Sequence, residues 1–142
     1  MRVAVVAVLL LASSAGPPWQ TVAQHDVSHG PRQRAFVAGS LQAAHAFAIF
    51  LRPEERAALA ALDYRTQAVV AVFRLVPSTG YTLEIRSLRR RASRLTIVVV
   101  LAAPTGAVSP VITTACHVVS VPKRLLGRPL PRRLVVREVR GG

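Results

Sequence analysis

The stretch from Pro77 to Leu101 constrains the fold more than any other part of this sequence. Tyr81, Leu83 and Ile85 alternate with polar residues, which is the period of a strand with one buried face. A second alternating run begins at Leu95, and a polar, arginine-rich connection joins the two runs. Such a pair predicts a β-hairpin, and few other segments can compete with it for the centre of a sheet.

The remaining elements are expected on both sides of this hairpin. Ser40 is a suitable N-cap for a helix over Leu41–Leu51, and Pro53 opens a second helix that ends near Leu62-Asp63. The valine-rich run Gln67–Arg74 predicts a strand covered on both faces. Further strands are expected at Trp19–Gln24, Arg34–Gly39, Val111–Val121 and Leu134–Val139. This order predicts an α+β fold: a mainly antiparallel, hairpin-centred β-sheet with one or two short helices packed on it.

The N-terminus has the pattern of a signal peptide. Arg2 precedes an apolar run over Val3–Ala12, and small residues follow as far as Ala15. The run is shorter than the roughly 20 residues that span a bilayer as a helix, and no cysteine follows it to carry a lipid anchor. We therefore expect residues 1–15 to be removed on export, leaving a secreted or cell-envelope protein without a stable membrane anchor. Residues 16–34 then supply a linker with a first strand and loop, and residues 35–140 form a single domain.

The chain is strongly basic, with 19 Lys and Arg against 6 Asp and Glu, a formal net charge of +13. Its densest charge cluster falls at the expected tip of the hairpin. A nucleic-acid surface would place stacking aromatic side chains among such cations, and no aromatic residue follows Tyr81. We therefore expect a solvated tip and no specific nucleic-acid partner. The cluster consists of Arg86, Arg89, Arg90, Arg91 and Arg94.

Cys116 and His117 place a nucleophile beside a base in the sequence. Adjacent residues of a strand point to opposite faces, so these two side chains cannot act on each other. A base from elsewhere would be His25, His29 or His45, and no spacing brings one of them to the thiol. The sequence therefore predicts a buried, unreactive Cys116.

The histidines and acidic residues do not form a metal or acid–base pattern either. His25 and His29 have the i, i+4 spacing of a helical metal site, but the polar segment His25–Arg34 contains Gly30-Pro31 and is predicted to be a loop. The six acidic residues are scattered along the chain. The sequence thus predicts no catalytic, metal or cofactor-binding residues, and a protein that is not an enzyme.

Four short motifs carry a resemblance to a known family. Leu62-Asp63-Tyr64 precedes the valine strand Val69–Val72, and Ser78–Ile85 combines a Thr-Gly-Tyr turn with a strand that ends in Ile. Thr114–Pro122 is similar to a Thr-Pro-Tyr-His-Val-Val strand. Together these motifs resemble the PrcB C-terminal domain family, over about Trp19 to Arg124. The resemblance implies an exported, noncatalytic accessory protein that binds and stabilises a secreted protease complex.

Two departures from that family pattern concern the turn and the later strand. Gly80 stands alone where the family has a glycine pair, and Ala115-Cys116 stand where Pro-Tyr is expected. Both departures bear on local geometry, the first on the turn and the second on the entry of the strand.

The turn also supports a second resemblance. Pro77–Tyr81 is similar to the Pro-Thr-Thr-Gly-Tyr loop that chagasin-type inhibitors insert into the cleft of papain-type cysteine peptidases. Arg128-Pro129 is faintly similar to a second inhibitory loop, but Leu83 stands where that family has Trp and no Gly-x-Gly-Gly loop exists. Inhibition is therefore the alternative hypothesis. Both hypotheses place the partner-binding residues in one turn: Pro77, Ser78, Thr79, Gly80 and Tyr81.

Overall fold

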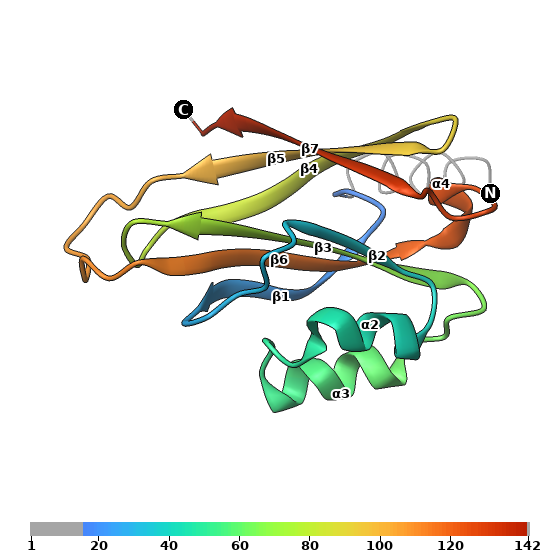
Figure 1. Cartoon of the computed structure of the whole chain (residues 1–142), viewed down its shortest axis with the longest axis horizontal. Helices are drawn as coiled ribbons and strands as arrows, with labels where there is room; N and C mark the ends of the chain where they lie inside the picture. Colours follow the sequence, from blue (N-terminus) through green and yellow to red (C-terminus); the bar gives the residue numbers. More distant parts are fainter. Residues whose placement is uncertain (1–15, 142) are drawn as a thin grey trace, which may run out of the picture.

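The computed structural model describes residues 16–141, in three layers (Figure 1). The expected signal peptide, residues 1–15, lies outside the described residues. Two helices cover one face of a four-stranded sheet, and a three-stranded sheet lies on its other face. The elements in chain order are β1 (Gln20–Val27), β2 (Ala35–Ala38), α2 (Leu41–Ala48), α3 (Pro53–Ala61), β3 (Gln67–Val76), β4 (Thr82–Arg91), β5 (Arg94–Ala102), β6 (Thr113–Pro122), α4 (Lys123–Leu126) and β7 (Arg133–Arg140). The prediction of an α+β fold with mainly antiparallel sheets is confirmed.

The four-stranded sheet has the strand order β1-β6-β3-β2, and all of its pairs are antiparallel. Its central strands, β3 and β6, are buried along nearly their whole length because both faces of the sheet are covered. The valine run that predicted a doubly covered strand is β3, which continues two residues further, to Val76. The sheet therefore forms the middle layer of the molecule.

The hairpin predicted from Pro77–Leu101 is present as β4 and β5, but it lies in the outer, three-stranded sheet. Its apolar face packs across the interior on the valines of β3 and β6. β7 completes this sheet by pairing with β5 in parallel. The sequence alternation identified the buried face of the hairpin, but it does not distinguish a strand that pairs with β3 from one that stacks on β3.

Both helices begin where local signals predict. The backbone N–H of Ala43 donates to Ser40 Oγ (3.1 Å) at the start of α2, and Pro53 opens α3. α2 ends at Ala48, three residues before the predicted end. Phe47 and Leu59 direct the apolar faces of the two helices into a core on the middle sheet. No helix within residues 16–141 is long and apolar enough to cross a membrane.

Two further strand boundaries differ from the prediction and change where candidate site residues lie. β1 extends to Val27, so His25 lies in a strand and not in the loop expected over His25–Arg34. β6 begins at Thr113, which leaves Val111 and Ile112 outside the strand and exposed. The sequence pattern does not separate the apolar Ile112 from the valine-rich strand that follows it, so its exposure to solvent could not be predicted locally.

Candidate functional site

The Pro77–Tyr81 turn joins β3 to β4 and is held against the β5–β6 connection. The backbone N–H of Thr79 donates to the Ser109 carbonyl (3.1 Å), and the N–H of Ser109 donates to Thr79 Oγ1 (3.0 Å). Pro77 is exposed, while Ser78 and Thr79 are half-buried. These reciprocal bonds tie the turn to the neighbouring connection.

Gly80 is required by the geometry of this turn. Its φ is +89°, a backbone conformation that residues with a Cβ rarely adopt. A Cβ there would lie 2.9 Å from Pro104 Cβ, and the Gly80 N–H donates to Asp26 Oδ2 of β1 (3.2 Å). Tyr81, the last residue of the turn, is half-buried against the core between the sheets. The turn therefore presents Pro77 and Gly80 to solvent more fully than its aromatic side chain.

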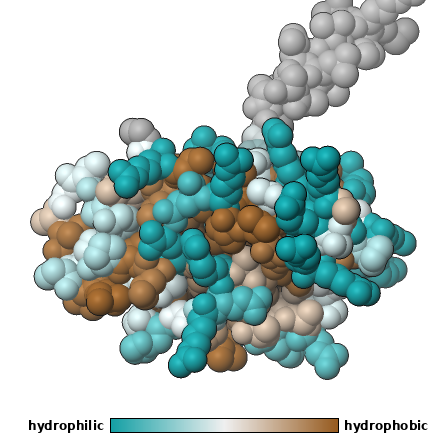
Figure 2. All heavy atoms as spheres, turned by 45° about the horizontal axis from the view of Figure 1, so that its top comes forward, coloured by the Kyte–Doolittle hydropathy of each residue, from teal (hydrophilic) through white to brown (hydrophobic). Residues whose placement is uncertain are grey.

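Large apolar side chains gather beside this turn. Leu75, two residues before Pro77, is 62% exposed, and Val111 and Ile112 are 57% and 66% exposed. Figure 2 shows hydrophobic surface at the same end of the molecule as the β5–β6 connection in Figure 1. The exposed apolar residues at this end, which we call the end patch, are Leu75, Val108, Val111 and Ile112.

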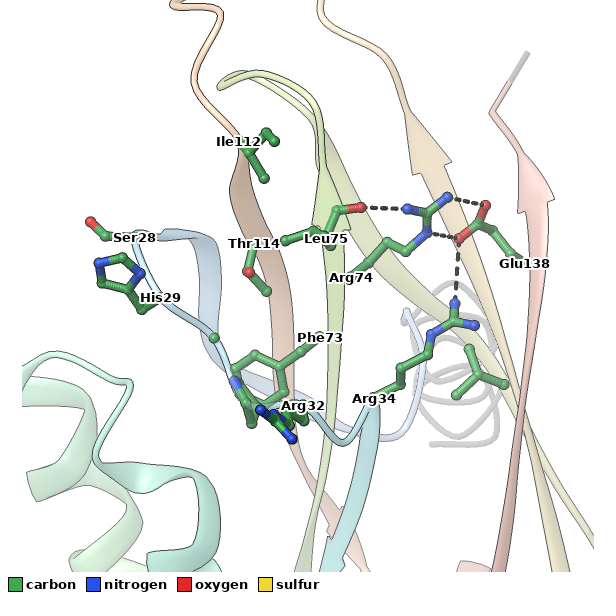
Figure 3. A pocket seen from close by; sticks show the side chains of 13 residues that line it. Ser28, His29, Arg32, Arg34, Phe73, Arg74, Leu75, Ile112, Thr114 and Glu138 are labelled. Atoms are coloured by element: carbon green, nitrogen blue, oxygen red, sulfur yellow. Dashed lines mark hydrogen bonds and ion pairs between the residues drawn. The ribbon is translucent and has the colours of Figure 1, made fainter.

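A hollow of about 850 Å³, which we call the side groove, adjoins the end patch (Figure 3). It forms because β2 is short. The last hydrogen bond between β2 and β3 runs from the Phe73 N–H to the Arg34 carbonyl (2.8 Å). Beyond that bond, the segment that connects β2 to β1 leaves the edge of β3. The groove lies between the Ser28–Arg34 segment and the end of β3, and Leu75 and Ile112 line it together with basic side chains. It therefore combines an apolar wall with charge.

Arginine dominates the charge of the side groove. Arg74 Nε lies 2.7 Å from Glu138 Oε1, and Arg34 Nη2 lies 3.8 Å from the same oxygen. The side chain of Arg32, a third lining residue, has no ion-pair partner within residues 16–141. Three guanidinium groups thus face one carboxylate, so the groove carries a net positive charge.

Cys116 is buried as predicted, with 1% of its surface exposed. Burial raises the pKa of its thiol to about 11, so the group remains a thiol at neutral pH. His25 pairs with Cys116 in the β1–β6 register, but its Nε2 lies 2.8 Å from both Glu55 carboxylate oxygens and its Nδ1 lies 3.0 Å from the Asp26 carbonyl. The imidazole ring thus ties β1 to α3 and is not held against the thiol.

The His25–Glu55 pair was missed because the sequence prediction ended the first strand at Gln24. A signal was available, since Ala23, His25 and Val27 continue the alternation of one strand face. A hydrogen-bonded pair between a strand and a helix needs contacts from two elements, which the strand pattern alone does not contain.

His117 lies on the opposite face of β6 from Cys116, as the strand alternation predicts. Its Nδ1 accepts from the Ile85 N–H of β4 (2.8 Å), and its Nε2 lies 2.9 Å from Thr21 Oγ1. Burial lowers the pKa of this imidazole, because the charged form would lose hydration. His117 therefore links the two sheets as a neutral ring.

The other histidines do not join a ligand set. His29 and His45 are exposed, and residues 16–141 contain no group of three or more His, Cys, Asp or Glu side chains that could hold a metal ion. The paired spacing of His25 and His29 is divided between a strand and the segment that follows it.

The arginine cluster predicted at the hairpin tip is divided by the structure. Arg91 and Arg94 form the closing pair of the hairpin, and Arg86 Nε bonds Glu84 Oε1 (3.0 Å) in β4. The Arg90 guanidinium instead reaches the carbonyls of Leu126 and Pro129. Part of the cluster is therefore structural and only part is a solvated tip.

Comparisons of the chain with protein-family models, with curated proteins and with solved structures found no match. The turn, the end patch and the side groove are therefore the features from which we infer a function.

Proposed function

We propose that this chain is a noncatalytic accessory protein that binds a protein partner through the end patch and the adjoining Pro77–Tyr81 turn. The exposure of Leu75, Val111 and Ile112 in one place carries this proposal. Contiguous apolar surface costs solvation free energy in a monomer and is typical of surfaces that bind other proteins. The partner we propose is a secreted protease complex, which the chain stabilises.

The rigidity of the neighbouring turn supports binding at this end. The bonds between Thr79 and Ser109 fix the turn before a partner arrives, so little conformational entropy is lost on association. Export, which the N-terminal pattern predicts, supports a partner among extracellular proteins. The basic charge of +13 favours a partner with an acidic surface.

The chagasin-type alternative gains support from the fixed Pro77–Tyr81 turn, which has the rigidity that an inhibitory loop needs. It loses support from Arg128-Pro129, the candidate second loop. The Pro129 carbonyl accepts from Arg90, near the hairpin tip, whereas Pro77–Tyr81 precedes the far end of β4. Two loops at opposite ends of a hairpin cannot enter one cleft, so we rank inhibition second.

The test captures partners from the producing cells' own culture medium with the full chain, tagged at its C-terminus. Val111→Glu should remove the captured protease, and Ile49→Glu, a matched change at a 73% exposed isoleucine of the helix layer, should retain it. The lifetime of the protease against autolysis is then measured with and without the chain. We expect a longer lifetime and unchanged initial activity.

Two results would contradict the proposal. Stoichiometric, reversible inhibition of a papain-type peptidase would favour the alternative, and equal capture by the Val111→Glu and wild-type chains would place binding elsewhere.

A further inference from the structure

The end of β3 is a free sheet edge inside the side groove. In an antiparallel ladder, every second residue directs its N–H and C=O to the same neighbouring strand. Phe73 directs its N–H to Arg34, so Leu75 faces the side from which β2 has turned away. The Arg74 guanidinium covers the Leu75 carbonyl, and no strand among residues 16–141 lies opposite the Leu75 N–H. This edge can accept one more short strand.

The apolar wall of the groove lies on one face of that edge. Leu75 pairs with Thr114, so these two residues belong to the same face of the sheet, and Ile112, just before β6, lines the groove with them. The helices leave this part of the face uncovered, because Leu75 and Ile112 remain mostly exposed. A strand that enters the groove would pack every second side chain on this wall.

The charge of the groove determines which residues fit at the alternate positions of such a strand, whose side chains do not pack on the apolar wall. Figure 3 shows Arg34 and Arg74 converging on Glu138, while Arg32 lies apart from that carboxylate, below Phe73. Carboxylates of an incoming segment could pair with Arg32, and with Arg34, whose Nη2 lies as far as 3.8 Å from Glu138 Oε1. Acidic residues therefore fit the groove, and basic residues would be repelled.

We propose that the side groove binds an extended acidic segment of a partner protein, which adds as a strand to the edge of β3 beside Leu75. This inference rests on the proposed function and names the chemistry of the partner's contact. A backbone bond from the Leu75 N–H gives the segment its position, the end-patch wall takes its apolar side chains, and Arg32 and Arg34 bind its carboxylates.

Neither a second copy nor a nucleic acid fits these features as well. Pairing of two β3 edges would bring the arginines of one copy against those of the other, and like charges on neighbouring strands are destabilising. A nucleic acid would use the arginines but leave Leu75 and Ile112 exposed to water.

The test measures fluorescence anisotropy of a fluorescein-labelled peptide, acetyl-Gly-Glu-Val-Glu-Val-Glu-Val-Glu-Gly, with the full chain. We expect binding that Ile112→Glu and Arg32→Glu each weaken by about tenfold. The matched controls Ile49→Glu and Arg94→Glu, in the helix layer and at the hairpin tip, should change it by less than about twofold. The same peptide with lysine in place of glutamate should not bind.

Several results would overturn the inference. The first two are the absence of peptide binding and an equal loss of peptide affinity in the groove and control variants. The third is displacement of the peptide by heparin that Ile112→Glu does not affect. The fourth is a dimer in sedimentation that Ile112→Glu disrupts. If the peptide fails while Val111→Glu still abolishes capture of the protease from culture medium, the groove inference is wrong and the proposed function stands. If the peptide binds but no protease is captured, the proposed function is wrong.

Discussion

The two long sides of the sandwich are joined in opposite ways. On the closed side, where β1 and β4 meet, side chains of the middle sheet satisfy the outer backbone edge of β4. Gln24 donates to the Leu83 carbonyl (2.9 Å), and the Ile85 N–H donates to His117 (2.8 Å). These bonds occupy the edge groups that another strand would need, so the closed side is structural.

On the open side, where β2 and β3 meet β7, the two sheets are joined by charged side chains at the surface. Arg74 and Arg34 share Glu138, and the side chains of Arg74 and Glu138 are about one-third exposed. Exposed ion pairs hold their geometry weakly and contribute little to stability. Hydrogen bonds from β1 and β6 side chains to the β4 backbone thus join the sheets on the closed side, whereas partly exposed ion pairs join them on the open side.

Removal of His117 should give the largest loss of stability. His117→Ala deletes a buried ring that bonds both Ile85 N–H and Thr21, and it leaves that N–H unpaired between the sheets. We expect a loss of about 3 kcal/mol in the free energy of unfolding, measured by urea denaturation. Thr21→Val, which removes only the second partner, should cost about 1 kcal/mol. A loss for His117→Ala no larger than that of Thr21→Val would show that the closed side is not the structural one.

Substitution of Gly80 should have the next largest effect, at the end of the sandwich that both sides share. Gly80→Val forces a β-branched residue into φ +89° and against Pro104, so we expect a loss of about 2 kcal/mol in the free energy of unfolding. Gly106→Val in the adjoining connection is the control, because a Cβ there meets nothing within 4 Å. Equal denaturation midpoints for the two variants would contradict the strain at Gly80.

Acidification should weaken the closed side by a smaller amount. The pKa of His117 is lowered in the folded protein, so its contribution to stability is fully present above the unfolded value of about 6.5. That contribution is lost as the pH falls through the lower folded pKa, since the unfolded state then binds the proton more readily. Urea denaturation between pH 7 and pH 4 should show a decline that is shallower in His117→Gln. An identical decline in both chains would assign it to other groups.

The smallest effect is expected on the open side. Glu138→Gln removes the carboxylate that Arg34 and Arg74 share, and we expect less than about 1 kcal/mol of lost stability because both partners are partly exposed. High salt should reduce even this difference, measured by denaturation in 1 M against 0.1 M NaCl. A loss as large as that of His117→Ala would remove the contrast between the two sides.

Local signals in the sequence predicted most of the elements. The Ser40 cap and Pro53 marked the helix starts, the alternation from Tyr81 marked the hairpin, and the valine run marked β3. Each of these signals depends on residues close together in the chain. The tertiary arrangement depends instead on contacts between distant segments. Examples are the place of the hairpin in a second sheet and the parallel pairing of β7 with β5.

The candidate site was predicted only in part. The sequence located the Pro77–Tyr81 turn, and the structure shows that the turn is hydrogen-bonded to Ser109 and that Tyr81 is half-buried. The side groove was not predicted, because it arises from the early end of β2 and not from any motif in its lining. The sequence predicts a strand that begins at Val111, but apolar character alone does not say where that strand begins or where the sheet stops being covered.

The parallel pairing of β7 with β5 has a consequence for how the chain emerges during synthesis. Thirty residues separate the end of β5 from the start of β7, so β5 is complete long before its outer neighbour exists. Until then, the run Leu95–Leu101, rich in β-branched residues and free of charge, presents an uncovered hydrogen-bonding edge. Proteolytic clipping after Pro131, followed by dissociation of β7, would recreate that state in the finished protein. A clipped molecule should therefore aggregate through β5 before the rest of the sandwich unfolds.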